Sequence, residues 1–259
     1  MFLSKMNNQF IGIFLVLLTL IILLIIYTFT TPIPQSNSYH HFADQRTLIG
    51  IPNFLNVTSN ILFILVSILG LRSLRHQWTT LGREGVVYLI LFIGVFLIGI
   101  GSAYYHWSPN NERLVWDRIP ITIVFMSLLS FLIMTRVNSN VGFRLLIPLI
   151  MLGIYSVLYW HWTEGLGRGD IRLYGFVQFY TMFLLGLILL FFPKPYPQTK
   201  AFIGMLVFYL FAKITEHYDL VIYKLNGQIS GHTLKHVFAA LGVYFVVIIL
   251  NSSSTSKYS

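Results

Sequence analysis

Long apolar runs separated by short polar connections make up most of this chain. Eight runs approach the length of about 20 residues that a helix needs to cross a bilayer. They lie at 10–28, 54–71, 86–104, 119–135, 145–160, 174–192, 202–214 and 233–250. Inside hydrocarbon every backbone polar group must be satisfied within the protein, so successive runs of this kind favour a bundle of helices. We therefore predict an all-α membrane protein that crosses the bilayer several times.

The first apolar run has two interpretations, a cleaved signal peptide or a retained membrane anchor. Its apolar core is long, and no small-residue cleavage site follows cleanly before Pro32 and Pro34. We therefore interpret this run as an uncleaved N-terminal anchor helix.

Composition supports the membrane assignment and excludes several other classes of protein. Hydrophobic residues make up 56% of the 259 residues and charged residues only 10%, which is unlike an ordinary soluble domain. The net charge is +9, yet the cations are scattered through short loops without a basic patch interleaved with aromatic residues, so we predict no nucleic-acid partner. There is no cysteine, which excludes disulfides, thiolate metal sites and cysteine nucleophiles.

The distribution of charge predicts an orientation in the membrane. If Met1 is cytoplasmic, the inner loops hold more Lys and Arg than the outer loops, which favours inner positions for both chain ends. Lys213 and Lys235 lie near the ends of predicted spans, where we interpret them as snorkelling to the interface. Most acidic residues fall on or near the outer face, including Asp117, Glu216 and Asp219. Acidic side chains contribute little to topology, so their clustering suggests a polar working face.

Three segments that are far apart in the sequence carry residues suited to metal chemistry. Ser102 and His106 are four residues apart in GSAYYH, so they share one helix face. Asp117 follows in LVWDRIP at the entry of the next span. His232 and His236 are also four residues apart, at the start of the last span. Because alternate spans run in opposite directions, all three segments are expected to meet at the outer face.

The histidine set predicts a catalytic zinc site. Three histidines leave one position of a tetrahedral zinc ion open for water, and a nearby carboxylate such as Asp117 could accept the proton of that water. The alternative for His232 and His236 is that they cap the helix or form ordinary hydrogen bonds. Ser102 has a similar alternative, a hydrogen bond to its own helix backbone. Glu216, His217 and Asp219 end the seventh predicted span, either as groups that support the site or as a solvated helix end.

These residues together resemble the alkaline ceramidase family, which is part of a wider membrane-hydrolase superfamily that includes adiponectin-receptor-like proteins. The resemblance consists of Ser102-x-x-x-His106, Asp117 and His232-x-x-x-His236 in this order. The segments NFLNVTSN, at 53–60, and YGFVQFY, at 174–180, support it.

The resemblance implies a seven-helix transmembrane core, here preceded by one additional N-terminal transmembrane helix. The domains would then be an anchor helix at 1–31, a ceramidase-like membrane domain at 32–251 and a polar tail at 252–259. In the site, the resemblance implies a zinc ion held by His106, His232 and His236, with Asp117 activating water. It also implies a role for Ser102 in stabilising the oxyanion.

The implied reaction is hydrolysis of the N-acyl amide bond of ceramide or a related lipid to a sphingoid base and a fatty acid. The expected partners are therefore a lipid substrate and the bilayer itself. Some members of the family also bind calcium through acidic residues near the first core helix. Here Asp44, Asn53 and Asn56 are the corresponding oxygen ligands, but Asn53 stands where a glutamate is expected, which makes calcium doubtful.

Two other classes of function compete with the zinc-dependent amidase. A receptor-like or sensor protein could keep the same zinc site for structure alone, although a purely structural metal does not require a positioned base such as Asp117. A retinal-binding photoprotein would need a lysine such as Lys235 in the middle of the membrane, whereas Lys235 lies near the mouth of the helix. For the location we predict a bacterial inner membrane, with the site facing the periplasm.

Overall fold

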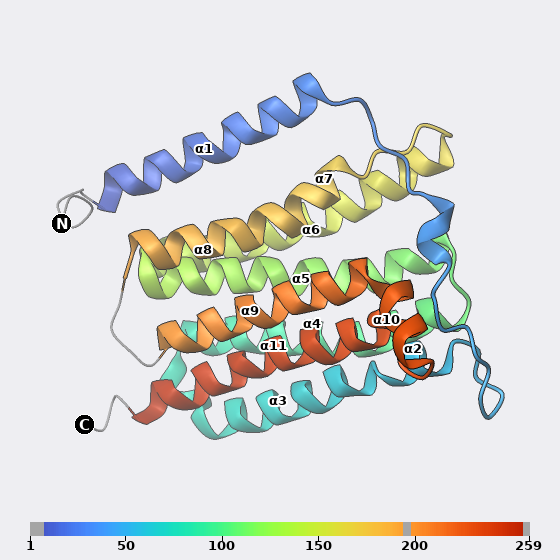
Figure 1. Cartoon of the computed structure of the whole chain (residues 1–259). Coiled ribbons are helices and arrows are strands. Elements are labelled where there is room, and N and C mark those ends of the chain that lie inside the picture. The colour runs from blue at the N-terminus through green and yellow to red at the C-terminus, as the bar shows by residue number, and fades with distance from the viewer. Residues whose placement is uncertain (1–7, 194–197, 256–259) are drawn as a thin grey trace. The chain divides into compact units, whose positions relative to one another are not determined.

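The computed structural model describes residues 8–193 and 198–255, and helices account for most of them (Figure 1). The elements are α1 (Asn8–Phe29), η2 (Asn37–His40), α2 (Phe54–Thr58), α3 (Ile61–Leu81), α4 (Arg83–Trp107), α5 (Asn111–Arg136), α6 (Ser139–Gly165), α7 (Arg172–Gly175), the π-helix η3 (Phe176–Tyr180), α8 (Thr181–Phe191), α9 (Gln198–His217), α10 (Asp219–Asn226) and α11 (Gly231–Thr255). No strand is assigned within the described ranges, where Leu48 and Ile51 form an isolated bridge. The prediction of an all-α membrane fold is confirmed.

Seven helical stretches among the described residues are long and apolar enough to cross a membrane. They are Phe10–Phe29, Phe54–Leu81, Arg83–Trp107, Asn111–Arg136, Ser139–Gly165, Arg172–Phe191 and Gly231–Ser252. The eighth predicted span falls in α9, which has 20 residues but carries Lys200 near its start and Lys213 and Glu216 near its end. These charges make α9 less apolar than the other seven stretches.

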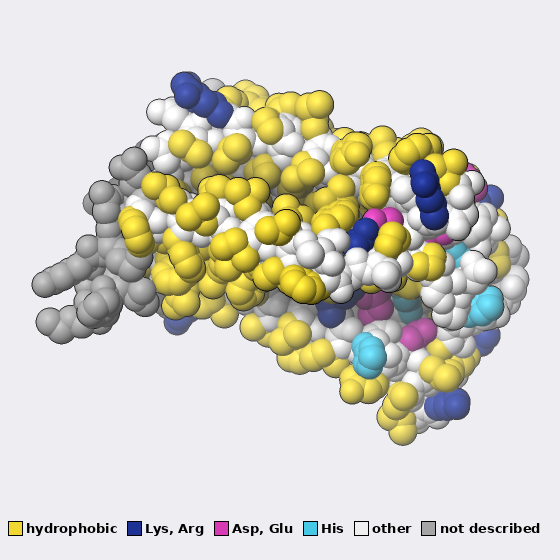
Figure 2. All heavy atoms as spheres, turned by 90° about the horizontal axis from the view of Figure 1, so that it is seen from above, with side chains coloured by type: hydrophobic (Ala, Val, Ile, Leu, Met, Phe, Trp, Pro, Cys, Tyr) yellow, Lys and Arg dark blue, Asp and Glu magenta, His cyan; other side chains and the backbone are white. Residues whose placement is uncertain are grey.

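Large hydrophobic side chains cover much of the visible helix surface (Figure 2). In α1 the share of buried residues is only 11%, against 72% in the most buried stretch, Asn111–Arg136. In water this surface would be costly, whereas in lipid it is the expected exterior of a membrane protein.

The chain divides into two compact units, which we describe separately. Unit 1 comprises residues 1–35 and 125–194, and unit 2 comprises residues 36–124 and 195–259. The helix α5 contributes its first half to unit 2 and its second half to unit 1.

Unit 1 contains α1, the second half of α5, and the helices from α6 to α8. The hydroxyl groups of Thr19 in α1 and Tyr180 in η3 lie 2.8 Å apart and form a hydrogen bond. The hydroxyl of Ser130 in α5 donates to the carbonyl oxygen of Gly142 in α6 at 2.9 Å. Before α7, the Asp170 carboxylate accepts hydrogen bonds from the Arg172 guanidinium at 2.8 and 2.7 Å. The first two contacts connect α1 to η3 and α5 to α6, and the third orders the residues that lead into α7.

Unit 2 contains every candidate site residue predicted from the sequence. Here α11 packs against α9 and α3, and α3 packs against α4. The predicted span beginning at Phe54 is interrupted between α2 and α3, where the Asn60 side chain donates to the carbonyl oxygen of Asn56 at 2.7 Å. Further along, the hydroxyl of Ser67 in α3 donates to the carbonyl oxygen of Phe92 in α4 at 2.7 Å. The end of α4 and the starts of α5 and α11 thereby come together.

Candidate metal centre

The helix termini of unit 2 bring the predicted residues together. Ser102 and His106 lie in the last turns of α4, Asp117 lies in the second turn of α5, and His232 and His236 lie in the first turns of α11. All five side chains are buried, with exposed fractions between 1% and 6%. The expectation that the three segments would meet therefore agrees with the geometry of unit 2.

The three histidine rings form a nearly equilateral triangle. The ring centroids of His106 and His232 are 4.8 Å apart, those of His106 and His236 are 4.9 Å apart, and those of His232 and His236 are 5.0 Å apart. One ring nitrogen from each histidine can be chosen so that all three lie within 4.8 Å of one another. Among the described residues, this is a cluster of at least three potential ligands that could hold a metal ion.

The unused nitrogen atoms indicate what the triangle is suited to hold. Nδ1 of His106, Nε2 of His232 and Nε2 of His236 are buried and have no hydrogen-bond partner among the described residues. Burial of a polar nitrogen without a partner is costly, and neutral imidazole is the commonest protein ligand for a metal such as zinc. The donor set therefore fits a metal ion, although it does not by itself identify the metal.

Ser59 orients one of these rings. Its hydroxyl donates to the carbonyl oxygen of Asn56 at 3.4 Å, and its oxygen lies 2.7 Å from Nδ1 of His236. If Nε2 of His236 is the ligand atom, the proton of the neutral ring lies on Nδ1, and the Nδ1–H donates to the Ser59 oxygen. This tautomer leaves the lone pair of Nε2 available as a ligand. A hydrogen bond from the far nitrogen of a ligating histidine is a usual feature of metal sites.

Asp117 is placed beside the histidines by a close approach of α4 and α5. The Asp117 carboxyl group forms a hydrogen bond with the Ser102 side chain. A Cβ atom at Gly101 would lie only 2.1 Å from the carbonyl oxygen of Trp116, so the two backbones come closer than any residue with a side chain would allow. Glycine at position 101 therefore permits the contact between the neighbouring residues Ser102 and Asp117.

The start of α11 is held by residues that cap its free backbone groups. Ser230 accepts a hydrogen bond from the N–H of Thr233 at 3.1 Å. Asp219 accepts one from the N–H of His232 at 2.7 Å, and a carboxylate at this position also complements the helix dipole. Gly231 lies so close to α9 that a Cβ atom would be 2.1 Å from the carbonyl oxygen of Thr215. These contacts fix the position of the two histidines of α11.

Residues 37–46, which we call the cover segment, lie over the histidine triangle. The Phe42 ring centroid is 4.6 Å from that of His106 and 4.6 Å from that of His232. His40 anchors the segment, because its Nε2 donates to Asn111 at 3.0 Å and its Nδ1 accepts from the Tyr105 hydroxyl at 2.9 Å. Burial lowers the pKa of His40, which favours the neutral tautomer in this arrangement.

The residues expected for a calcium site make other contacts in this chain. Both oxygens of the Asp44 carboxylate accept hydrogen bonds from the Arg46 guanidinium, each at 2.8 Å. Burial of Asp44 raises its pKa, but the hydrogen bonds from Arg46 outweigh this effect and hold the pKa below its ordinary value. The Asn53 amide donates to the carbonyl oxygen of His106 at 2.9 Å, and Oδ1 of Asn56 accepts from Thr233 at 2.8 Å.

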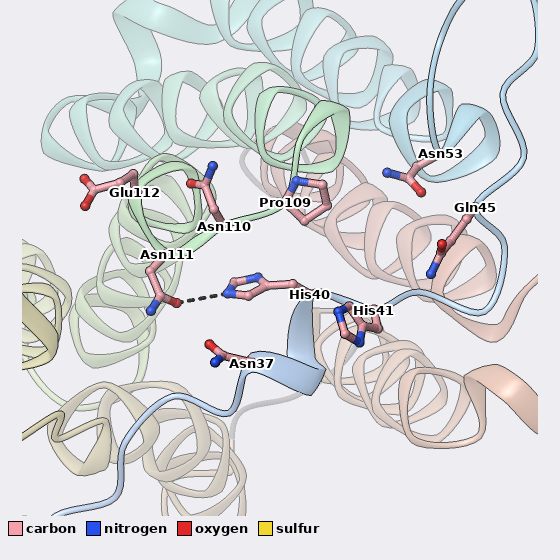
Figure 3. Close-up of a pocket in the computed structure, with 9 residues that line it drawn as sticks. All are labelled: Asn37, His40, His41, Gln45, Asn53, Pro109, Asn110, Asn111 and Glu112. Carbon is pink, nitrogen blue, oxygen red and sulfur yellow. Dashed lines mark hydrogen bonds between the residues drawn. The ribbon is translucent and has the colours of Figure 1, made fainter. Parts of the chain in front are cut away.

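A pocket of about 640 Å³ adjoins the cover segment (Figure 3). Its lining comes from this segment, from the residue before α2, from the turn between α4 and α5 and from the start of α5. The lining residues are Asn37, His40, His41, Gln45, Asn53, Asn110, Asn111 and Glu112, with Pro109. Carboxamides predominate, and no lysine or arginine lines this pocket.

The sequence analysis gave too little importance to several residues around the histidine triangle. Glu216 forms ion pairs with Lys213 and Lys235, so the interpretation of these lysines as snorkelling side chains is wrong. His217 is exposed, as expected for a solvated helix end, whereas Glu216 and Asp219 are partly buried. Phe42 and Ser59 were missed. Ser59 lies inside the segment 53–60 that supported the resemblance, which was the available signal.

The fold and this site define an all-α membrane protein with a buried three-histidine candidate metal centre. A family model described as Ceramidase matches residues 47–258, and the chain belongs to this family. The family comprises membrane hydrolases that act on the amide bond of ceramide. The match includes Ser102, His106, Asp117, His232 and His236, whereas α1 and Asp44 precede it. A search of curated proteins found no match.

Proposed function

We propose that this chain is a zinc-dependent intramembrane amidase. It would cleave the N-acyl bond of ceramide or a related lipid to a sphingoid base and a fatty acid. The observation that carries the proposal is the set of three converging histidines, each with one buried ring nitrogen that lacks a hydrogen-bond partner among the described residues. Membership of the ceramidase family supports the choice of substrate.

His106, His232 and His236 would hold the zinc ion. When bound, zinc lowers the pKa of a coordinated water to about 7 and polarises a carbonyl group. Three protein ligands leave a position open for chemistry, whereas a structural zinc site usually has four.

Asp117 would act as the general base and then as the general acid. Its carboxylate accepts a proton from the attacking water, whose oxygen forms a bond to the acyl carbon. The carbon–nitrogen bond then breaks, and Asp117 returns the proton to the leaving nitrogen, giving a free amine and a fatty acid. Ser102 would orient Asp117 by donating its hydroxyl proton to the carboxylate. Once Asp117 has taken the proton of the water, the protonated Asp117 would donate to the Ser102 oxygen, and the Ser102 hydroxyl would then donate to the oxyanion that develops on the carbonyl oxygen.

We also propose that residues 1–31 form an anchor outside a catalytic membrane domain at 32–251, with a polar tail at 252–259. The family match begins at residue 47, beyond α1, which supports the separation of the anchor from the catalytic domain. The excess of Lys and Arg in the loops opposite the site supports an orientation with the site on the non-cytoplasmic face. We propose a bacterial inner membrane, with the site facing the periplasm.

The test is to measure zinc content and fatty-acid release from a panel of ceramides for detergent-purified wild type and His236→Ala. We expect about one zinc ion per wild-type chain, and we expect zinc and activity to be lost together in the variant. His217→Ala is the matched control, because His217 is exposed at the end of α9. A wild-type protein without zinc would overturn the proposal. Zinc without turnover of any N-acyl lipid would favour a sensor.

A further inference from the structure

A cluster of partly buried ionic side chains lies beside the histidine triangle and has no role in the chemistry proposed above. The Lys235 ammonium is 2.5 Å from Oε1 of Glu216, and Lys213 pairs with Oε2 of the same carboxylate. The side chains of Lys235 and Glu216 are only 19% and 15% exposed. One carboxylate therefore serves two ammonium groups. Ionised groups within membrane spans are costly and usually face a partner or a functional cavity.

Lys235 belongs to the side of α11 that borders the reacting groups. It directly precedes His236 and lies three residues after His232, which is one turn of the helix. Among charged groups, Lys235 has the strongest electrostatic effect on both the Asp117 carboxyl and the Tyr39 hydroxyl. Its ammonium is therefore near the general base as well as the metal ligands.

The ammonium of Lys235 has the capacity to bind a further group. It carries three N–H donors, and the carboxylate of Glu216 is the acceptor that the structure gives it among the described residues. Arg118, which follows Asp117 directly, adds another cation, with its guanidinium 5.6 Å from the centroid of the Tyr39 ring. The nearby carboxylate of Asp219 is turned towards the backbone N–H groups of Ala43 and His232. The surroundings of Lys235 thus favour an anion.

We propose that Lys235 forms an anion subsite next to the amide-cleaving centre. The preferred substrate is then an N-acyl lipid that carries a phosphate or carboxylate close to its amide bond. This inference rests on the proposed amidase function and specifies its substrate class. A neutral hydroxylated headgroup gives no reason for a partly buried ammonium beside the metal ligands, whereas an anionic headgroup forms a strong charge-assisted hydrogen bond with it.

The alternative role of Lys235 is purely structural, since its ion pair with Glu216 also connects α11 to α9. The two roles predict different kinetics. A structural connection affects all substrates alike, because its loss disturbs the position of the histidines. An anion subsite affects selectivity between charged and neutral substrates.

The experiment compares kcat/KM for ceramide, ceramide 1-phosphate and N-acylglycine in the full-length zinc-loaded protein. We expect at least one anionic substrate to be preferred over ceramide by about tenfold or more, and Lys235→Met to reduce this ratio about tenfold. Lys235→Arg, which keeps the charge, should retain the ratio within about threefold. Lys224→Met removes an exposed lysine from α10 and is the matched control, with no change in the ratio.

Two results would overturn the anion subsite. One is a wild-type protein that hydrolyses neutral ceramide in preference to both anionic substrates, a result that does not depend on whether any variant folds. The other is an equal loss of activity on all three substrates in Lys235→Met. In both cases zinc content and turnover of ceramide would leave the amidase proposal standing. Absence of zinc and of turnover on every substrate would overturn both proposals together.

Discussion

The oxygen of the Ser59 hydroxyl lies 2.7 Å from Nδ1 of His236, and this contact fixes which nitrogen of the histidine faces the candidate metal position. We expect Ser59→Ala to weaken zinc binding about 10–100-fold, because the ring loses its fixed orientation and its far N–H loses an acceptor. Competition with a zinc chelator measures the change. Thr58→Ala is the control, since the Thr58 hydroxyl donates to the carbonyl oxygen of Phe54 in its own helix. Equal affinities of wild type and Ser59→Ala would exclude the orienting role.

Gly101 permits the close contact between α4 and α5, so a methyl group at this position should separate them. A Cβ atom would lie 2.1 Å from the carbonyl oxygen of Trp116, and a backbone atom cannot rotate away. We expect Gly101→Ala to reduce the free energy of unfolding by about 1–3 kcal/mol and to lower turnover. Gly186→Ala has open space around its Cβ and should unfold at the wild-type temperature or above. Thermal unfolding in detergent provides the measurement, and equal losses in both variants would refute the specific contact.

Asp117 distinguishes an amidase from a sensor with a structural metal. Asp117→Asn keeps the shape of the side chain but cannot accept a proton, so we expect turnover to fall at least about 100-fold while zinc remains bound. Glu112→Gln changes an exposed carboxylate near the start of the same helix and should leave both quantities unchanged. If Asp117→Asn loses zinc together with activity, Asp117 contributes to metal binding rather than to proton transfer.

The pairing of Asp170 with Arg172 should make stability depend on acid pH. The hydrogen bonds from Arg172 hold the pKa of Asp170 below its ordinary value in the folded protein. Stabilisation from this pair is therefore fully present above the unfolded pKa of about 3.9 and is lost as the pH falls through the lower folded value. Asp170→Asn should reduce the loss of stability between about pH 5 and pH 2.

The control for this pair is Tyr159→Phe, which removes a longer hydrogen bond of 3.4 Å to Asp170 and leaves the arginine in place. It should retain most of the acid dependence. Unfolding in detergent as a function of pH measures both variants, and parallel curves for wild type and Asp170→Asn would count against a role for this pair.

The Arg46 guanidinium occupies both oxygens of the Asp44 carboxylate, so we expect stability to be independent of calcium. Addition of calcium or of a calcium chelator should leave the unfolding temperature of the wild type unchanged. Arg46→Met leaves a buried carboxylate without this partner and should lower the unfolding temperature. If calcium raises the unfolding temperature of the wild type, the Asp44 carboxylate exchanges its arginine for the ion.

Periodicity and topology predicted much of the site, because helix ends alternate between the two membrane faces. This rule placed His106, Asp117 and the two histidines of α11 at one end without knowledge of how the helices pack. It did not predict the ion pair between Glu216 and Lys235. That contact depends on which faces of α9 and α11 meet, and both helices are apolar over most of their circumference.

The cover segment is the part of the site that sequence reasoning could not place. Its residues have neither helical nor strand periodicity, and its contacts reach distant parts of the chain, as from His40 to Tyr105. Phe42 looked like any other aromatic residue, because nothing nearby in the sequence indicates that it covers His106 and His232. Similarly, the predicted continuous span from Phe54 is divided into α2 and α3, and at the break the Asn60 side chain donates to the carbonyl oxygen of Asn56.

The two oxygens of Asp219 serve different segments, since one accepts from the N–H of Ala43 and the other from the N–H of His232. Ala43 follows Phe42 directly, so the same carboxylate holds both the aromatic ring above the histidines and the backbone that presents one of them. Movement of the cover segment away from the site must therefore stretch a bond to the residue that also anchors His232. Access to the centre and the placement of its ligands are mechanically coupled through one side chain.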